Sequence, residues 1–245
     1  MRLATWNING LRARLEYVCH WLRAVQPDVV GFQELKTTDD KFPTMDFQAL
    51  GYHSVSYGQK SWNGVAVLSK TPIEVTQMGL PGQDEMGARL LGVNTADINF
   101  TTVYVPNGKT LEHEDWGRKL RWLEALNAHL VERHDPAAPA VLCGDFNVVP
   151  TALDTWREGR GIFCTPQERG LIQGLLDWGL VDVWRAQRPE DPGFSWWDYR
   201  AGAFHKGMGL RIDLLLATAT LAERVTSVDL DRTWRKKVEG LTPSD

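Results

Sequence analysis

Short apolar runs separated by polar turns recur along the whole chain, and most of them have the length of a β-strand. The predicted strands cover residues 2–7, 28–33, 52–57, 65–69, 73–78, 90–98, 100–105, 140–142, 181–184, 211–217 and 225–230. We expect a tight turn at residues 97–99, between two of these strands. The runs at 29–32 and 141–143 are apolar without alternation, which predicts strands that are buried on both faces.

Three longer segments repeat their apolar residues at helical spacing, over residues 11–25, 116–130 and 171–178. Pro27 ends the first helix. The third begins at Thr165, which forms a capping box with Glu168, and it stops at Gly179. Strands and helices alternate early, give way to a strand-rich stretch, and alternate again. This order predicts an α/β protein in which layered sheets are covered by helices.

Composition fits one globular domain over residues 1–245, because 43% of the residues are hydrophobic, 24% are charged and no linker interrupts them. We expect no signal peptide and no membrane span, since no apolar run is long enough to cross a bilayer. The three cysteines lack metal-binding spacing and predict reduced thiols in a cytoplasmic protein.

The net charge of −4 argues against a protein that binds polyanions indiscriminately, but it leaves local basic faces open. Such faces could form at residues 12–14, 118–121 and 232–237, although each cluster also fits a solvated helix or loop. Most of the eleven tryptophans should lie in the core, and an exposed minority could stack on bases or a sugar.

Acids and amides stand at the ends of several predicted strands: Asn7 and Asn9, Glu34, Asp145 and Asn147, and Asp213, with Asp245 as a further acid. Carboxylate and amide oxygens that reach one rim from separate strands suit a hard cation such as Mg²⁺ and chemistry on a phosphate. Singly, each motif also fits a turn or a cap. In the chemical interpretation, an acid such as Asp145 accepts a proton from water, and Asn147 holds that water or a phosphate oxygen.

Asp213 is the sharpest single candidate because it stands inside an apolar run, where an unpaired acid is costly to bury. It needs a metal, an arginine or a histidine. Arg211 is close in sequence, but we do not expect it to be the partner, so we favour a functional role for Asp213.

Two further segments combine aromatic and polar residues. Tyr104 and Asn107 end a strand and could donate to phosphate oxygens, or they could be a core tyrosine and a turn. Residues 194–199 form an aromatic strand with one face for packing and another that could be a wall for a sugar or a base.

In their order and spacing, these motifs resemble the exonuclease III family of AP endonucleases, of the endonuclease/exonuclease/phosphatase superfamily. The matching segments are residues 6–14, 26–36, 58–60, 104–108, 144–147, 180–184, 194–200 and 209–216. The resemblance implies a four-layer α/β sandwich of two packed mixed β-sheets flanked by helices. It also implies a monomer that uses Mg²⁺ or Mn²⁺ to cut double-stranded DNA by activated-water attack on phosphorus. Incision 5′ to abasic sites, 3′→5′ exonuclease action and removal of blocked 3′ ends are the expected activities.

The resemblance also implies roles for single residues. Glu34 is the expected principal metal ligand, with Asn7, Asn9 and Asp245 beside it. Asp145 activates water with Asn147, Tyr104 contacts the phosphate, and Asp213 pairs with a catalytic histidine. The implied DNA contacts are Lys36, Arg89 and Asn107, with Trp196, Leu210 and Ile212 around a base-less sugar.

The family motif Ser-Asp-His is represented by Ser244 and Asp245, so we expect the natural chain to continue with a histidine and a final strand. Two alternatives stay open at this point. The protein could act on another phosphodiester, as a general DNase or on RNA or lipid. If the histidine is truly absent, it could bind damaged DNA without cutting it.

Overall fold

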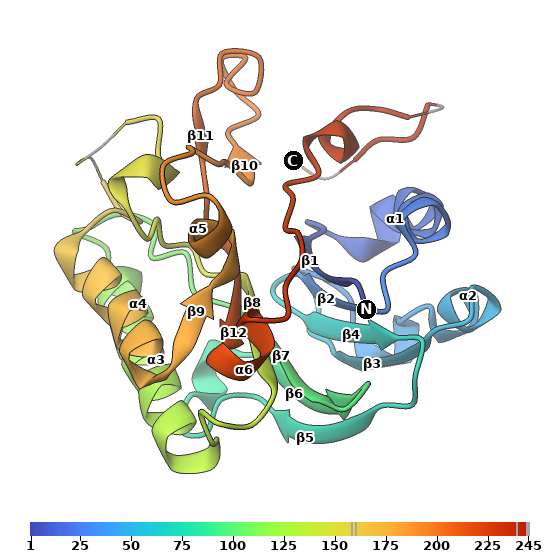
Figure 1. Ribbon diagram of the computed structural model, residues 1–245. Coiled ribbons are helices and arrows are strands. Elements are labelled where there is room, and N and C mark those ends of the chain that lie inside the picture. The colour runs from blue at the N-terminus through green and yellow to red at the C-terminus, as the bar shows by residue number, and fades with distance from the viewer. Residues whose placement is uncertain (158, 160, 239, 244–245) are drawn as a thin grey trace.

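The structure is a computed structural model that describes residues 1–157, 159, 161–238 and 240–243. Two β-sheets pack face to face, and helices cover the outer face of each (Figure 1). The first sheet contains β1 (Leu3–Asn7), β2 (Val29–Gln33), β3 (His53–Tyr57) and β4 (Val65–Ser69). Its strand order is β1-β2-β4-β3, and only β1 and β2 run parallel.

The second sheet contains β5 (Glu74–Met78), β6 (Leu90–Thr95), β7 (Ile98–Tyr104), β8 (Ala140–Asp145), β9 (Leu180–Asp182) and β12 (Asp213–Thr218). Its order is β5-β6-β7-β8-β12-β9, with β7 and β8 parallel and the other pairs antiparallel. A separate short ribbon pairs β10 (Trp196–Trp197) with β11 (Gly209–Leu210). Both main sheets are therefore mixed, as the family resemblance implied.

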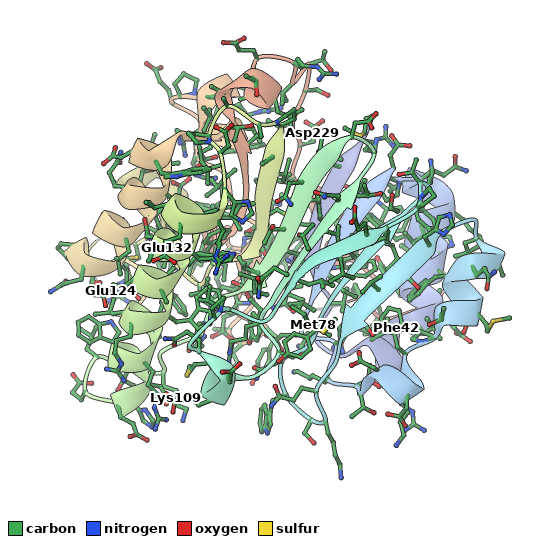
Figure 2. The ribbon with its side chains drawn as sticks, turned by 90° about the horizontal axis from the view of Figure 1, so that it is seen from below. Phe42, Met78, Lys109, Glu124, Glu132 and Asp229 are labelled. Carbon is green, nitrogen blue, oxygen red and sulfur yellow. The ribbon has the colours of Figure 1, made fainter. Side chains whose placement is uncertain are left out.

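The helices are α1 (Leu11–Val25), α2 (Thr44–Ala49), α3 (Glu114–Arg133), α4 (Pro166–Trp178), α5 (Val183–Gln187) and α6 (Ala219–Ala222). Short 3₁₀ turns cover Asp39–Lys41, Asp84–Met86, Ala152–Asp154 and Arg232–Arg235. The exposed face of α3 carries Glu124 and Glu132, while its opposite face packs on the second sheet (Figure 2). Among the described residues, no helix combines the length and apolarity that a bilayer crossing requires.

Three apolar clusters join the layers. The cluster between the sheets includes Val67 and Phe100, and the one between α1 and the first sheet includes Leu22 and Phe32. The third packs α3 and α4 on the second sheet. Each sheet is thus buried on both faces, which explains the apolar runs of its central strands. The predicted four-layer sandwich is confirmed.

Several predicted elements were wrong in detail, among them the aromatic strand 194–199, of which only Trp196–Trp197 is a strand. Residues 225–230 form no strand, because Gln187 and Arg188 take the carbonyls of Val225 and Val228 in place of a neighbouring strand. The predicted strand 181–184 gives way at Val183 to α5, which the Asp182 side chain caps.

The predicted turn at 97–99 lies one residue earlier. Ala96 and Asp97 both adopt left-handed conformations, with φ of 50° and 60°, so that Ile98 already belongs to β7.

Candidate active site

The polar strand ends meet at one edge of the sandwich because of the strand pairing. Asn7 ends β1 beside the end of β2, and Tyr104 ends β7 opposite Asp145 of β8. Strand β12 runs antiparallel to β8, so its first residue, Asp213, pairs directly with Asp145. A cavity of about 450 Å³ opens at this edge. Predicted residues that line it are Asn7, Asn9, Glu34, Tyr104, Asn107, Asp145, Asn147, Trp196, Ile212 and Asp213.

Asn7 connects the two sheets at the floor of the cavity. Its side-chain Nδ2 donates to Glu34 Oε1 at 3.0 Å and to Asp145 Oδ2 at 2.9 Å, and its Oδ1 accepts from the Asn9 amide at 3.0 Å. The Tyr104 hydroxyl donates to the same Glu34 oxygen at 2.7 Å. The four groups around Asn7 are therefore held by mutual hydrogen bonds before any substrate arrives.

Asn147 reaches the site through a turn. Its φ of 49° is left-handed, and its backbone N–H donates to Asp145 Oδ1 at 2.9 Å. The side-chain Nδ2 donates to Val105 O at 2.9 Å, and its Oδ1 accepts from Asn107 Nδ2 at 3.3 Å. A tight local turn therefore brings Asp145 and Asn147 together.

The buried Asp145 and the partly buried Asp213 form a pair of like charges. Burial, followed by the charge of Asp213, raises the pKa of Asp145 well above its ordinary value. Burial likewise raises the pKa of Asp213, although the positive charge of Arg235 works against it. Among the described groups, Asp213 Oδ1 has no hydrogen-bond partner, while the backbone amide of Asp213 donates to Ser195 Oγ at 3.0 Å.

The pKa values of Glu34 and Tyr104 shift in opposite directions, which suits the two side chains to different tasks. Burial pushes the pKa of Glu34 up, but hydrogen bonds from Asn7, Lys36 and Tyr104 outweigh it and hold that pKa below its ordinary value. Burial and the charges of Glu34 and Asp145 raise the pKa of Tyr104. At neutral pH, Glu34 is therefore an anion and Tyr104 a neutral hydrogen-bond donor.

Some predicted residues do not line the cavity. The Lys36 ammonium lies 2.9 Å from Glu34 Oε2, and Leu210 pairs with Trp196 across the β10–β11 ribbon. Arg89 lies behind Tyr104: it donates to the Tyr104 carbonyl at 3.1 Å, and its guanidinium carbon is 4.8 Å from the ring centroid. Asp245 lies outside the described residues.

The cavity also contains residues that the sequence argument did not single out as site residues, namely Lys109, Ile162, Phe163, Asp198, Tyr199, Arg200 and Arg235. Lys109 follows β7 in the loop that leads to α3 (Figure 2). Tyr199 and Arg235 had a signal, since one lies in the aromatic segment and the other in a basic cluster. Ile162 and Phe163 had none, because an apolar pair before a helix cap looks like ordinary packing.

The donor set suits a hard cation bound by few protein ligands. In the part of the chain that the structure describes, no three His, Cys, Asp or Glu side chains come close enough to form a metal cluster of their own. Carboxylates and amide oxygens nevertheless share the cavity, and Asp213 keeps an unbonded buried oxygen. Mg²⁺ typically takes one or two carboxylates and completes its shell with water and substrate oxygens. The residues present fit such an ion.

Comparisons with known proteins agree with this geometry. The endonuclease/exonuclease/phosphatase family profile matches residues 4–245. Exodeoxyribonuclease III of Haemophilus influenzae is 35% identical, over 94% of this chain and 92% of its own. The structure is similar to an AP endonuclease from Archaeoglobus fulgidus, with 37% identity and a TM-score of 0.88 over 91% of this chain and 88% of that one. A 3′ phosphatase from Neisseria, bound to a product DNA hairpin, gives 33% identity and a TM-score of 0.93 over 100% and 96% of the two chains.

The chain belongs to the endonuclease/exonuclease/phosphatase family. Within that family of metal-dependent nucleases it is an enzyme of the exonuclease III and AP endonuclease type. The predicted family and enzyme class are confirmed.

Proposed function

We propose that this protein is a DNA-repair nuclease that hydrolyses the phosphodiester 5′ to abasic sites in duplex DNA, degrades 3′ ends and removes 3′ blocking groups. One observation carries the proposal. A single cavity combines a cluster of acids and amides at its floor with an apolar wall that includes Trp196 and Ile212. The named activities of the relatives, exonuclease, AP endonuclease and 3′ phosphatase, support it.

Mg²⁺ or Mn²⁺ is the proposed cofactor, with Glu34 as its main ligand and Asn7 and Asn9 beside it. Asp245 stays a predicted further ligand. The lowered pKa of Glu34 supports this choice, because a ligand must be ionised at neutral pH. When bound, the ion supplies positive charge that stabilises the phosphate as its own negative charge grows.

Asp145 is the proposed general base. Its carboxylate takes the proton of a water that Asn147 helps to orient, and a raised pKa makes Asp145 a better proton acceptor near neutral pH. The activated water attacks phosphorus in line and expels the 3′ oxygen of the preceding nucleotide. Tyr104 is neutral because its pKa is raised, and on substrate binding its hydroxyl turns from Glu34 to donate a hydrogen bond to a phosphate oxygen. Asp213 offers its unbonded oxygen to a protonated group that assists the leaving oxygen, such as the histidine of the family motif.

The apolar wall provides selectivity. A sugar without a base can enter beside Trp196 and Ile212, whereas a normal nucleotide must first be unstacked and then lacks room for its base. Phosphate contacts position the duplex, with Lys36 and Asn107 at the rim and Arg89 holding Tyr104. We expect affinity to fall steeply with salt, because such contacts release counterions.

We further propose that the protein acts as a monomer in the cytoplasm. The location is supported by three buried cysteines, Cys19, Cys143 and Cys164, which form no disulfides.

The proposal is tested with two duplexes, one containing a tetrahydrofuran abasic analogue and one ending in a 3′ phosphate, each incubated with the protein and Mg²⁺. We expect incision directly 5′ to the analogue, release of inorganic phosphate from the other duplex, and loss of both activities with EDTA. RNA and phosphoinositide substrates in parallel should react far more slowly. Preferential turnover of RNA or lipid, or tight binding of the abasic duplex without cleavage above an Asp145→Asn control, would refute it.

A further inference from the structure

A buried ion pair lies directly behind the active site. Lys119 of α3 and Glu168 of α4 are both 0% exposed, and the Lys119 ammonium contacts Glu168 Oε1 at 2.5 Å. Lys119 was one of the basic residues that fitted a solvated helix face, so its burial overturns that interpretation. Helices α3 and α4 already share an apolar cluster that contains Trp122, Leu126 and Ile172. The ion pair is therefore not needed merely to hold the two helices together.

Lys119 has a second partner on the catalytic side. Its ammonium donates to the backbone carbonyl of Asn147 at 2.6 Å. Asn147 has a left-handed backbone, and its amide N–H is held by Asp145 at 2.9 Å. Lys119 thus fixes the far side of the turn that sets the distance between the proposed base and the amide that orients water.

Glu168 has a second set of partners on the apolar side. Its Oε1 accepts from the backbone N–H of Phe163 at 3.1 Å, and its Oε2 accepts from the N–H and hydroxyl of Thr165 at 3.0 and 2.8 Å. The Lys119 ammonium also lies 4.7 Å from the centroid of the Phe163 ring. Phe163 is therefore held at its backbone by one member of the pair and at its ring by the other.

Phe163 adopts an unusual conformation in the cavity wall. Its φ is 81°, a region that a bulky residue rarely occupies and that persists only when the surroundings enforce it. The ring lines the same cavity as Asp145 and packs in the apolar cluster with Ile212 and Trp196.

We propose that Lys119 and Glu168 are positioning residues that place Asn147 and Phe163 relative to each other, and that Phe163 is a specificity-determining wall of the sugar pocket. The inference rests on the proposed function. Because the pair contacts both residues, the water-orienting amide and the wall that selects a base-less sugar move as one unit. Buried ion pairs can often be replaced by well-packed apolar residues without loss of stability, and of the two residues the capping box needs only Glu168. Helix stability therefore does not account for the contact of Lys119 with Asn147.

The test uses the double variant Lys119→Met/Glu168→Gln, which removes both charges and so avoids leaving one of them buried alone. We expect its melting temperature to fall, because a glutamine in place of Glu168 cannot accept from both Phe163 and Thr165 and the Asn147 carbonyl loses its donor. The rates are therefore measured well below the melting temperature and per folded enzyme. We expect kcat for abasic-site incision and for 3′-phosphate release to fall about 10- to 100-fold, with KM changed less, because Asn147 serves the chemistry of both reactions. The matched control is Asp28→Asn/Lys70→Met, a surface pair at 3.3 Å, which should leave both rates unchanged.

A second variant, Phe163→Gly, tests the wall and is independent of the pair's folding. Glycine accepts φ of 81° without strain, so the variant should fold. We expect incision at the abasic analogue to fall about tenfold while release of a 3′ phosphate, which places no sugar beyond the scissile phosphate, stays within twofold.

Wild-type rates in a folded double variant, or equal loss of both activities in Phe163→Gly, would overturn the inference. If the wild type itself cuts neither duplex, the proposed function fails instead, so the two failures are distinguishable.

Discussion

Two groups of buried acids lie on neighbouring elements and are treated in opposite ways. Asp154 and Asp182 share Arg211, whose guanidinium donates to all four carboxylate oxygens at 2.7–3.0 Å. Asp145 and Asp213 face each other across β8 and β12, and among the described residues no arginine donates a hydrogen bond to either. The first group is fully paired with arginine, whereas in the second, within the described chain, Asp213 has only the charge of Arg235 to offset its own and Asp145 faces a like charge.

The pKa values follow that difference. Burial alone would raise the pKa of Asp154, but hydrogen bonds and charge from Arg211 hold it below its ordinary value, whereas the pKa values of Asp145 and Asp213 are raised. Asp154 is thereby held as an anion and, with Arg211, fixes the surrounding loop. An acid whose pKa is raised can exchange a proton. The contrast separates acids that hold the site in shape from acids that perform its chemistry.

The largest expected effect comes from exchanging acid for amide in each group. Asp145→Asn should lower kcat about 10²- to 10⁴-fold, the usual contribution of a general base, and leave the protein folded. Asp182→Asn should instead lower the free energy of unfolding and leave kcat of the folded enzyme within a fewfold. Steady-state incision assays and urea denaturation of both variants check the pair. An Asp182→Asn variant that is stable but inactive would contradict the assignment of Asp182 to stability rather than to chemistry.

Replacing Arg211, the cation that Asp154 and Asp182 share, should strongly destabilise the fold. Arg211→Met leaves two acids buried beside each other, so we expect a loss of about 3–5 kcal/mol in the free energy of unfolding. Arg185 still reaches Asp154 at 2.6 Å, which favours the lower end of that range. Chemical denaturation at neutral pH measures the loss. A change below about 1 kcal/mol would show that the network contributes little.

A substitution of Glu34 tests whether this acid belongs to the metal site, in contrast to the acids that hold the fold. Glu34→Gln keeps the shape of the side chain but removes its negative charge. The Mg²⁺ concentration needed for half-maximal activity should therefore rise about 10- to 100-fold. Excess Mg²⁺ should restore much of the rate. An unchanged Mg²⁺ dependence would remove Glu34 from the metal site.

The smallest expected effect is a difference in the pH dependence of stability. The folded-state pKa of Asp213 lies above the unfolded value, so the folded protein binds more protons and loses stability as pH rises through that window. The pKa of Asp154 is lowered in the folded protein. The stability that this acid contributes is therefore present at neutral pH and lost as pH falls.

Asp213→Asn should therefore stabilise the metal-free protein at pH 8 by about 1 kcal/mol and have no such effect near pH 4. Thermal unfolding with EDTA at both pH values decides the point. A variant that is less stable at pH 8 would contradict the assigned direction.

Sequence reasoning predicted the sheets, the main helices and most of the cavity floor, because apolar periodicity and strand-end acids are local signals. Helix α1, for example, ends where Pro27 required. The expectation that Arg211 is not the partner of Asp213 was also confirmed.

What the sequence left out depends on contacts between distant residues. The burial of Lys119 arises from its pairing with Glu168, 49 positions away, and nothing near Lys119 in the sequence indicates it. The left-handed Phe163 contacts the same pair, and nothing in the local pattern indicates its conformation. The environment of such residues can be identified only once the packing of the helices is known.

The most direct test of the account is the fate of oxygen in one turnover. A duplex with a natural aldehydic abasic site is cut in H₂¹⁸O with excess enzyme and Mg²⁺, and both fragments are analysed by tandem mass spectrometry. This measurement separates ¹⁸O in the phosphate from ¹⁸O that the aldehyde takes up by exchange with water. Attack of activated water on phosphorus predicts one ¹⁸O in the 5′-phosphate of the downstream fragment and an unlabelled 3′-hydroxyl upstream. An unsaturated aldehyde at the 3′ end, with no ¹⁸O in the phosphate, would mean elimination and would contradict the role assigned to Asp145.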